Sequence, residues 1–125
     1  VIFPKTTMLL ENNHDLIVNI TNDAWFGSSR GPHQHLALAK IRAVLEGKYM
    51  VRVANTGIST IIDYNGNIVE KINLGEAGII DKKLVLYKKN TLYTYLGDYT
   101  FCVLLLVLVL ILIKINFKYG LKNKI

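Results

Sequence analysis

The chain is small, basic and apolar: it has 125 residues, with 15 Lys and Arg against 9 Asp and Glu, and a formal net charge of +6. This length allows one domain at most. Residues 1–80 hold seven basic and seven acidic side chains, whereas residues 81–125 hold eight lysines and two aspartates. Because the surplus of positive charge flanks the most apolar run of the sequence, it indicates a membrane segment and argues against nucleic-acid binding. The single cysteine excludes an internal disulfide and a Cys-rich zinc site.

The first residues read as the inside of a longer sequence. They form an apolar phrase, Val1-Ile2-Phe3-Pro4, without an initiator Met or a charged region, so no signal peptide is recognisable. We therefore expect the chain to be part of a longer protein.

A strand and an aromatic loop are the first predicted elements. The β-branched run at residues 16–20 predicts a buried strand, and the polar Asn22 and Asp23 follow its end. In the loop at residues 24–32, Trp25 lies next to another large aromatic residue. Such a pair in a loop is expected to fill a pocket.

A helix and a second strand come next. Residues 33–46 predict the helix, since Pro32 suits its first turn and Gly47 its end. Residues 49–54 predict the strand, and residues 55–57 a turn.

A hairpin and a further strand complete the predicted body. Residues 59–64 and 67–72 flank Asn65-Gly66, a strong hairpin signal. Residues 77–86 predict one more strand. The order of strand, helix, strand and hairpin indicates an α/β (α+β layered) fold.

The most apolar run predicts a transmembrane helix. Residues 101–113 are thirteen residues without a polar side chain except Cys102, and they span roughly 20 Å of a core of roughly 30 Å. Flanking aromatic residues and a snorkelling lysine extend the predicted span to residues 99–117, followed by a basic tail at residues 118–125. A buried core helix is the alternative, but a body this small offers little core to cover it.

Lysines around this span predict its orientation. Four follow it or lie near its end: Lys114, Lys118, Lys122 and Lys124. By the positive-inside tendency they place the C-terminus in the cytoplasm and residues 1–98 outside it. Four others precede the span, namely Lys82, Lys83, Lys88 and Lys89. They belong to a folded domain, and such domains translocate largely regardless of charge.

No catalytic or metal-binding group can be assembled from the residue pattern. His33 and His35 are two apart on a helix and point away from each other, so we expect His35 to pack or to hydrogen-bond. Cys102 has only apolar neighbours, which keep a thiol protonated and inert. Ser59, in Gly57-Ile58-Ser59, lacks the second glycine of a nucleophile elbow and has no assigned base. We expect no metal and no cofactor.

The strand ends suggest a binding wall instead. Asn22, Asp23, Trp25 and Phe26 follow one strand, and residues 55–57 end the next, where ligands gather in sheets of this class. The alternative is that the two polar residues only cap the loop and the tryptophan belongs to the core. Composition alone leaves both possibilities open.

Four phrases carry a family resemblance. They read NDAWFG at residues 22–27, GPHQH at 31–35, RA at 42–43 and RVANTGIS at 52–59. In order and spacing, and with a terminal membrane helix, the chain resembles apolipoprotein N-acyltransferases, membrane enzymes of the nitrilase (carbon-nitrogen hydrolase) superfamily. The resemblance implies the C-terminal part of a nitrilase-like αββα sandwich over residues 1–98, followed by one transmembrane helix.

The resemblance also implies an activity. It is transfer of an acyl chain from a phospholipid, through a Cys thioester, to the N-terminal diacylglyceryl-cysteine of a lipoprotein at the bacterial inner membrane, with a Glu base and a Lys that stabilises the oxyanion. In such proteins the nucleophile lies in a Cys-Tyr-Glu phrase directly before the phrase that is Val1–Pro4 here, and the Glu and Lys lie further upstream. The resemblance thus places no catalytic residue on these 125 residues, and Cys102 cannot replace the nucleophile.

The substrate pocket is a further implication of the resemblance. Its implied residues are Asn22, Asp23, Trp25, Phe26, Gly27, Asn55 and Thr56. Arg42 and Arg52 are interpreted as structural partners of acidic groups. We expect the chain to be inactive alone. The alternatives are a non-catalytic, membrane-anchored remnant or binding module, one half of a split enzyme completed by an upstream half-chain that carries the Cys, and an anchored nitrilase-type amidase.

Overall fold

The protein is represented by a computed structural model that describes residues 14–122, with side chains described through Asn116. The opening phrase Val1–Pro4 and the side chains of the predicted basic tail lie outside the described residues. The chain divides into two compact units, one ending at Thr91 and one beginning at Leu92. Each unit is described by itself.

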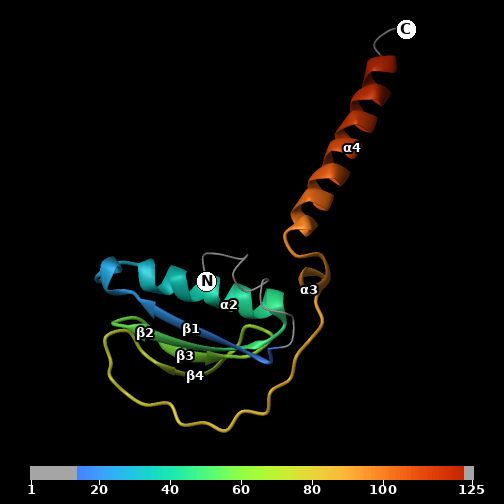
Figure 1. Ribbon diagram of the computed structural model, residues 1–125. Coiled ribbons are helices and arrows are strands. Elements are labelled where there is room, and N and C mark those ends of the chain that lie inside the picture. The colour runs from blue at the N-terminus through green and yellow to red at the C-terminus, as the bar shows by residue number, and fades with distance from the viewer. Residues whose placement is uncertain (1–13, 123–125) are drawn as a thin grey trace. The chain divides into compact units, whose positions relative to one another are not determined.

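The first unit is a four-stranded sheet with one helix on it. Its elements are β1 (Leu16–Asn22), α2 (Gly31–Glu46), β2 (Tyr49–Asn55), β3 (Ser59–Ile62) and β4 (Ile68–Ile72). The strand order is β1-β2-β3-β4, with β1 and β2 parallel and the other pairs antiparallel. In Figure 1, α2 connects the two parallel strands and lies along one face of the sheet. The mixed α/β fold predicted from the sequence is confirmed.

Helix α2 begins two residues before its predicted start and ends where it was predicted to end. Pro32 lies in its first turn, where the missing N–H costs nothing. Gly47 ends the helix in the left-handed conformation, with φ of 63°. The N–H groups of Lys48 and Gly47 then donate to Ala43 O and Val44 O, each at 3.1 Å, and so satisfy the last carbonyls.

The core lies between α2 and the sheet. Ile17, Met50 and Ile62 come from three strands and pack with a helix face made of Leu36, Ala39 and Ala43. The two alanines are fully buried, and their small side chains let the helix approach the sheet closely. Alternation along each strand explains why these strand residues lie in the core, because every second side chain of a strand points to the same face of the sheet.

The opposite face of the sheet is apolar and exposed along β1 and β2. Val18, Ile20 and Val53 are exposed over 61%, 81% and 51% of their surface. They lie side by side, since the parallel register pairs Ile20 with Val53. The described part of the first unit therefore presents an exposed apolar patch on β1 and β2.

The β3–β4 hairpin is closed by Asp63. Its carboxylate accepts hydrogen bonds from the backbone N–H groups of Asn65 and Asn67, both at 2.8 Å, and from Asn67 Nδ2 at 3.0 Å. Gly66 supplies the left-handed residue that the turn needs, with φ of 83°. The predicted hairpin is confirmed, but both strands are shorter than predicted because the residues from Asp63 onward belong to the turn.

The predicted strand at residues 77–86 is wrong. No strand is assigned from Asn73 to Thr91, and this segment is irregular. A strand needs a neighbouring strand with which its backbone N–H and C=O groups form hydrogen bonds. The end of this segment is instead bonded to the residue that follows helix α2, because Lys89 N donates to Gly47 O at 2.8 Å. At the start of the segment, Glu76 accepts a hydrogen bond from Asn73 Nδ2 at 3.0 Å, which stabilises a turn away from β4.

The second unit contains the predicted membrane helix. It consists of α3 (Leu92–Leu96) and α4 (Tyr99–Lys122). The window Tyr99–Asn116 has a mean hydropathy of 2.5 and none of it is buried, so the alternative of a buried core helix is not supported. By length and composition this helix is a candidate membrane span. It continues to Lys122, past the predicted end at residue 117.

Candidate functional site

The ends of β1 and β2 are joined by polar groups. Asp23 N donates to Asn55 O at 3.1 Å, and Asn55 Nδ2 reaches Asn22 Oδ1 at 3.4 Å. The same Asn22 oxygen accepts a hydrogen bond from Ala24 N at 3.0 Å. Because parallel strands end at one edge of a sheet, residues 33 positions apart meet here.

Asp23 lies beneath this edge in a buried group of three side chains. Its Oδ2 is 2.7 Å from Arg52 Nη2, and its Oδ1 is 2.7 Å from His35 Nδ1. The side chains of Asp23 and Arg52 are fully buried and that of His35 is nearly so. The predictions that Arg52 pairs with an acid and that His35 forms a hydrogen bond are confirmed. Both carboxylate oxygens of Asp23 are used to hold β1, α2 and β2 together.

Close packing fixes the loop that follows Asp23. A Cβ on Gly57 would lie 2.3 Å from Asp23 Oδ2, and one on Gly31 would lie 2.3 Å from Phe26 Cδ1. The Phe26 ring meets the imidazole of His35 edge-on, with a centroid separation of 6.0 Å. The absence of a side chain at the two glycines is therefore what lets the loop lie against the helix and the strand ends.

Trp25 projects outward from this fixed loop. It is the middle residue of a 3-10 turn, Ala24–Phe26, and 84% of its surface is exposed, against 41% for Phe26. The expectation that the aromatic pair fills a pocket is wrong for Trp25 within the described chain, and so is the alternative that it belongs to the core. The turn is held by the bond from Phe26 N to Asp23 O, at 3.0 Å, and by the contact of the Phe26 ring with His35, and these contacts leave the central side chain exposed.

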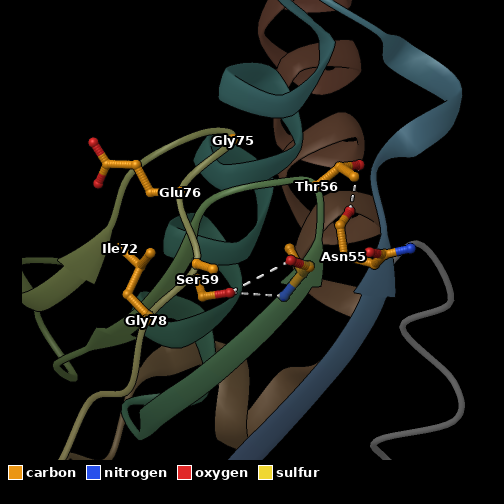
Figure 2. Close-up of a pocket in the computed structure, with 9 residues that line it drawn as sticks. Asn55, Thr56, Ser59, Ile72, Gly75, Glu76 and Gly78 are labelled. Atoms are coloured by element: carbon orange, nitrogen blue, oxygen red, sulfur yellow. Dashed lines mark hydrogen bonds between the residues drawn. The ribbon is translucent and has the colours of Figure 1, made fainter.

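A cavity of about 390 Å³ lies on the other side of Asn55 (Figure 2). It is bounded by the end of β2, the following turn, β3 and the chain after β4, through Ala54, Asn55, Thr56, Ser59, Ile72, Gly75, Glu76, Ala77 and Gly78. Thr56 has a φ of 57° and donates through its hydroxyl to Asn55 O at 2.7 Å. Ser59 Oγ accepts a hydrogen bond from Ala54 N at 3.1 Å. The side chain of Glu76 extends away from those of Ser59 and Asn55 (Figure 2).

The structure separates the residues that the sequence grouped together. Asn55 and Thr56 line the cavity, Asp23 is buried, and Trp25 projects from the loop. Asn22 ends β1, and Phe26 and Gly27 belong to the loop that follows it; these three residues do not line the cavity. Asn22 and Asn55 are the link between the loop and the cavity wall.

Sequence reasoning missed the wall formed by residues 72–78, because only the fold brings this stretch to the end of β2. Its run of small residues was the available signal. By contrast, Arg52 could be assigned from alternation, since it shares its face of β2 with the buried Met50 and Ala54. Arg42 is paired as predicted, with its Nη2 2.5 Å from Glu46 Oε1 on the same helix.

The chemistry available at this site is binding and positioning. Within residues 14–122, no group of three or more His, Cys, Asp or Glu side chains is placed to hold a metal ion. Cys102, the one cysteine of the sequence, lies exposed on α4 within the candidate span. The strand-end site thus offers an exposed indole, amide groups and a cavity.

Residues 1–88 match the carbon-nitrogen hydrolase family. The chain belongs to this family. Over 104 residues it is 41% identical to an apolipoprotein N-acyltransferase of Rhodopseudomonas palustris, which covers 83% of this chain and 19% of the relative. It is 42% identical over 108 residues to the enzyme of that name from Rickettsia bellii (83% of this chain, 21% of the relative) and 44% identical over 102 residues to that from Rickettsia prowazekii (78% and 20%).

This carbon-nitrogen hydrolase chain spans about a fifth of the length of the curated relatives it matches. The activity in the relatives' name belongs to each relative as a whole. The matched part corresponds to the sheet, the strand-end site and part of the chain after β4.

Proposed function

We propose that the chain is the C-terminal part of a membrane N-acyltransferase. This enzyme would move an acyl chain from a phospholipid, through a Cys thioester, to the N-terminal diacylglyceryl-cysteine of a lipoprotein. The observation that carries the proposal is identity of 41–44% to three apolipoprotein N-acyltransferases over 78–83% of this chain. The rigid loop that exposes Trp25 supports it, because an exposed aromatic side chain on a fixed turn is suited to contact a substrate.

The strand-end residues have different roles in this proposal. Trp25 contacts the acyl chain or the acceptor, with Phe26 and Gly27 shaping the turn that carries it. Asn55 and Thr56 contact substrate from the cavity, and Asn22 connects the loop that carries Trp25 with the cavity wall. Asp23 is a positioning residue, since both of its oxygens are already engaged by His35 and Arg52. Positioning of this kind raises the rate by fixing the reacting groups near one another.

The covalent steps belong to other parts of the enzyme. The only thiol of the 125 residues is that of Cys102, which lies in the candidate membrane span. A thioester intermediate needs a thiolate beside a base and an oxyanion-stabilising group. We therefore expect the 125 residues alone to be inactive.

The proposed topology is built on the candidate span. Residues 1–98 form the partial carbon-nitrogen hydrolase domain outside the cytoplasm, residues 99–117 cross the bacterial inner membrane, and residues 118–125 form a basic cytoplasmic tail. The exposed, apolar window Tyr99–Asn116 supports this arrangement. The three lysines in the tail give the orientation by the positive-inside tendency.

A chimera tests the proposal. The chain replaces the matching part of the Rickettsia bellii relative, and purified protein in detergent is assayed for acyl transfer from phospholipid to a diacylglyceryl lipopeptide. We expect an active chimera, a strongly reduced kcat/KM after Trp25→Ala, and nearly unchanged activity after the control Tyr87→Ala, which alters another exposed aromatic residue, in the irregular segment. A folded, membrane-inserted chimera without activity, or acyl transfer by the 125 residues alone, would contradict the proposal.

The exposed sheet face favours a second candidate, one half of a two-chain enzyme. Val18, Ile20 and Val53 form an apolar surface that a separate upstream half-chain carrying the Cys could cover. Co-expression with the N-terminal part of the same relative tests it. Co-purification with acyl transfer supports this candidate, whereas lipopeptide binding by the chain alone, without any transfer in the presence of the other half, indicates a non-catalytic binding module.

A further inference from the structure

The second unit contains a fixed elbow before the candidate span. Helix α3 (Leu92–Leu96) is joined to α4 by Gly97 and Asp98. Gly97 N donates to Tyr93 O at 2.7 Å, and Gly97 adopts the left-handed conformation with φ of 53°. The Tyr93 hydroxyl donates to Asp98 Oδ1 at 2.9 Å, and the Thr100 hydroxyl donates to Gly97 O at 2.8 Å. These bonds hold the start of α4 at a set angle to α3.

Large side chains point outward around this elbow. Leu92, Tyr95 and Tyr99 are exposed over 74%, 72% and 76% of their surface, and Leu96 over 43%. We call these four residues the collar. Asp98 is the one charged residue from Leu92 to Ile113, and the hydroxyl of Tyr93 engages its carboxylate. The collar is therefore apolar with two phenolic hydroxyls and has no formal charge of its own.

We propose that the collar lies in the interface of a phospholipid bilayer, between the headgroups and the acyl chains, and anchors the end of the span at which α4 begins. This inference rests on the proposed membrane location. Tyrosine suits this zone, because its ring is apolar and its hydroxyl is polar, so that each part meets the environment it favours. Leucines next to the two tyrosines add apolar contact with the upper acyl chains.

Chain connectivity restricts where the collar can lie. Tyr95 is four residues before Tyr99, the first residue of the candidate span, and even an extended chain of that length covers only about 14 Å. Once α4 crosses a bilayer, the collar is confined to its surface layer. A protein partner would need a surface of matching shape, whereas the lipid interface surrounds the end of the span in every orientation.

Anchoring would also set the depth of α4. The helix has 24 residues and is about 36 Å long, which exceeds the hydrocarbon thickness of roughly 30 Å. If Tyr99 is held at one interface, about 20 residues cross the core, and the lysine-rich end of the sequence reaches the opposite interface. Without an anchor, the excess length could be taken up by tilt or by sliding.

Single-tryptophan fluorescence tests the proposal, because Trp25 is the only tryptophan of the chain. In the full chain carrying Trp25→Phe, a probe is introduced as Tyr95→Trp or, for the bilayer centre, as Leu106→Trp. The protein is reconstituted in phosphatidylcholine vesicles brominated either near the headgroup or near the end of the acyl chain. We expect the Tyr95→Trp probe to lose more fluorescence to the shallow bromines, and the Leu106→Trp probe to lose more to the deep ones.

The possible results distinguish the hypothesis of the collar from that of the membrane span. A Tyr95→Trp probe that neither lipid quenches, beside a Leu106→Trp probe quenched by deep bromines, overturns the collar and leaves the span standing. A collar covered by another protein segment would give the same result. Absence of quenching for both probes overturns the span and the collar together.

A second pair of variants tests anchoring itself. In the Leu106→Trp protein, Leu92→Ser with Tyr95→Ser should reduce the difference between deep and shallow quenching, because α4 is no longer held at one depth. The matched control is Ile79→Ser with Tyr87→Ser, which removes a similarly exposed apolar pair from the first unit. An unchanged depth profile in the collar variant would overturn the anchoring role.

Discussion

Asp23 shows how one carboxylate organises the strand-end site. Arg52 of β2 and His35 of α2 each engage one of its oxygens at 2.7 Å, and Gly57 leaves the space in which it lies. A buried charge is tolerated only when it is paired and hydrogen-bonded, so the contacts depend on one another. The exposed Trp25 two residues later depends on this group for its position and contributes little to it.

Arg52→Leu should therefore be strongly destabilising. It leaves the Asp23 carboxylate without its cationic partner, and removing one member of a buried ion pair costs about 3–5 kcal/mol. Urea unfolding of the purified chain in detergent, followed by circular dichroism of the sheet unit, measures the loss. Lys71→Leu, at an exposed position of β4, is the control and should change the free energy of unfolding by less than about 0.5 kcal/mol. An Arg52 variant as stable as the control would show that the pair is not needed.

Substitutions at Trp25 and Gly57 should distinguish a loss of acyl transfer from a loss of stability. Trp25→Ala removes an exposed side chain, so the free energy of unfolding should stay within about 0.5 kcal/mol while acyl transfer by the chimera falls. Gly57→Ala should lower the free energy of unfolding by more than about 1 kcal/mol, because its Cβ would lie 2.3 Å from Asp23 Oδ2. Thermal unfolding and kcat/KM are measured on the same preparations. A large stability loss in the Trp25 variant would argue that its indole is structural.

At the scale of elements, helix α2 and the β3–β4 hairpin each end in a local device that the sequence reveals. Gly47 ends the helix and Asp63 closes the hairpin. Gly47 also has a long-range role, since a Cβ there would lie 1.9 Å from Lys89 O. The end of the helix is thus also the place where the irregular segment is tied to the body.

Gly47→Ala should destabilise the protein through both effects. The left-handed conformation costs a non-glycine residue about 1–2 kcal/mol, and the contact with Lys89 O adds to it. Gly75→Ala isolates the first effect, because Gly75 has a φ of 76° and no atom lies within 4 Å of its Cβ position. Urea unfolding should show a larger loss for the Gly47 variant. Equal losses would indicate that the irregular segment simply moves aside.

Asp63 should make the hairpin sensitive to acid. Burial raises the pKa of its carboxyl, but hydrogen bonds from Asn67, Asn65 and Gly66 outweigh burial and hold that pKa below its usual range. A lowered folded-state pKa means that the stabilisation is complete above the unfolded value of about 3.9 and is lost as the pH falls through the folded value.

The variant Asp63→Asn measures this contribution. The natural protein should be more stable than the variant at pH 7, and the difference in the free energy of unfolding should shrink as the pH is lowered below about 4. Urea unfolding at a series of pH values gives the comparison. A difference that is constant with pH would mean that the side-chain amide replaces the carboxylate fully.

At the scale of the molecule, the outward sheet face is the feature that most needs a partner. Val18, Ile20 and Val53 are exposed, although β-branched residues in neighbouring strands are usually covered. The chain also spans about a fifth of its relatives' length. Both facts agree with a sheet that is covered by other parts of a longer enzyme.

Ile20→Lys should therefore act differently in the two contexts. In the chain alone, the residue is 81% exposed, so the fold should be kept and self-association should decrease. In the chimera with the Rickettsia bellii relative, the same lysine would be buried against the covering layer and should abolish activity. Light scattering and acyl transfer are the two measurements, and full activity of the Ile20→Lys chimera would show that this face stays uncovered.

The sequence by itself determined the elements that depend on near neighbours. Helix α2 between Pro32 and Gly47, the turn at Asn65-Gly66 and the apolar helix after Tyr99 follow from capping, turn chemistry and hydropathy, which act over a few residues. The face of β2 on which Arg52 lies follows from strand alternation. These predictions hold because the causes lie within the segment concerned.

Only the tertiary structure decided the burial of Asp23, the exposure of Trp25 and the irregular course of residues 77–86. Asp23 is buried because residues 12 and 29 positions away supply its partners, and its loop then turns Trp25 outward. The segment after β4 has the composition of a strand, but strand formation requires a neighbour with free backbone groups. A sequence pattern specifies which side chains favour a strand or a pocket, whereas the long-range partners that complete either one exist only in the fold.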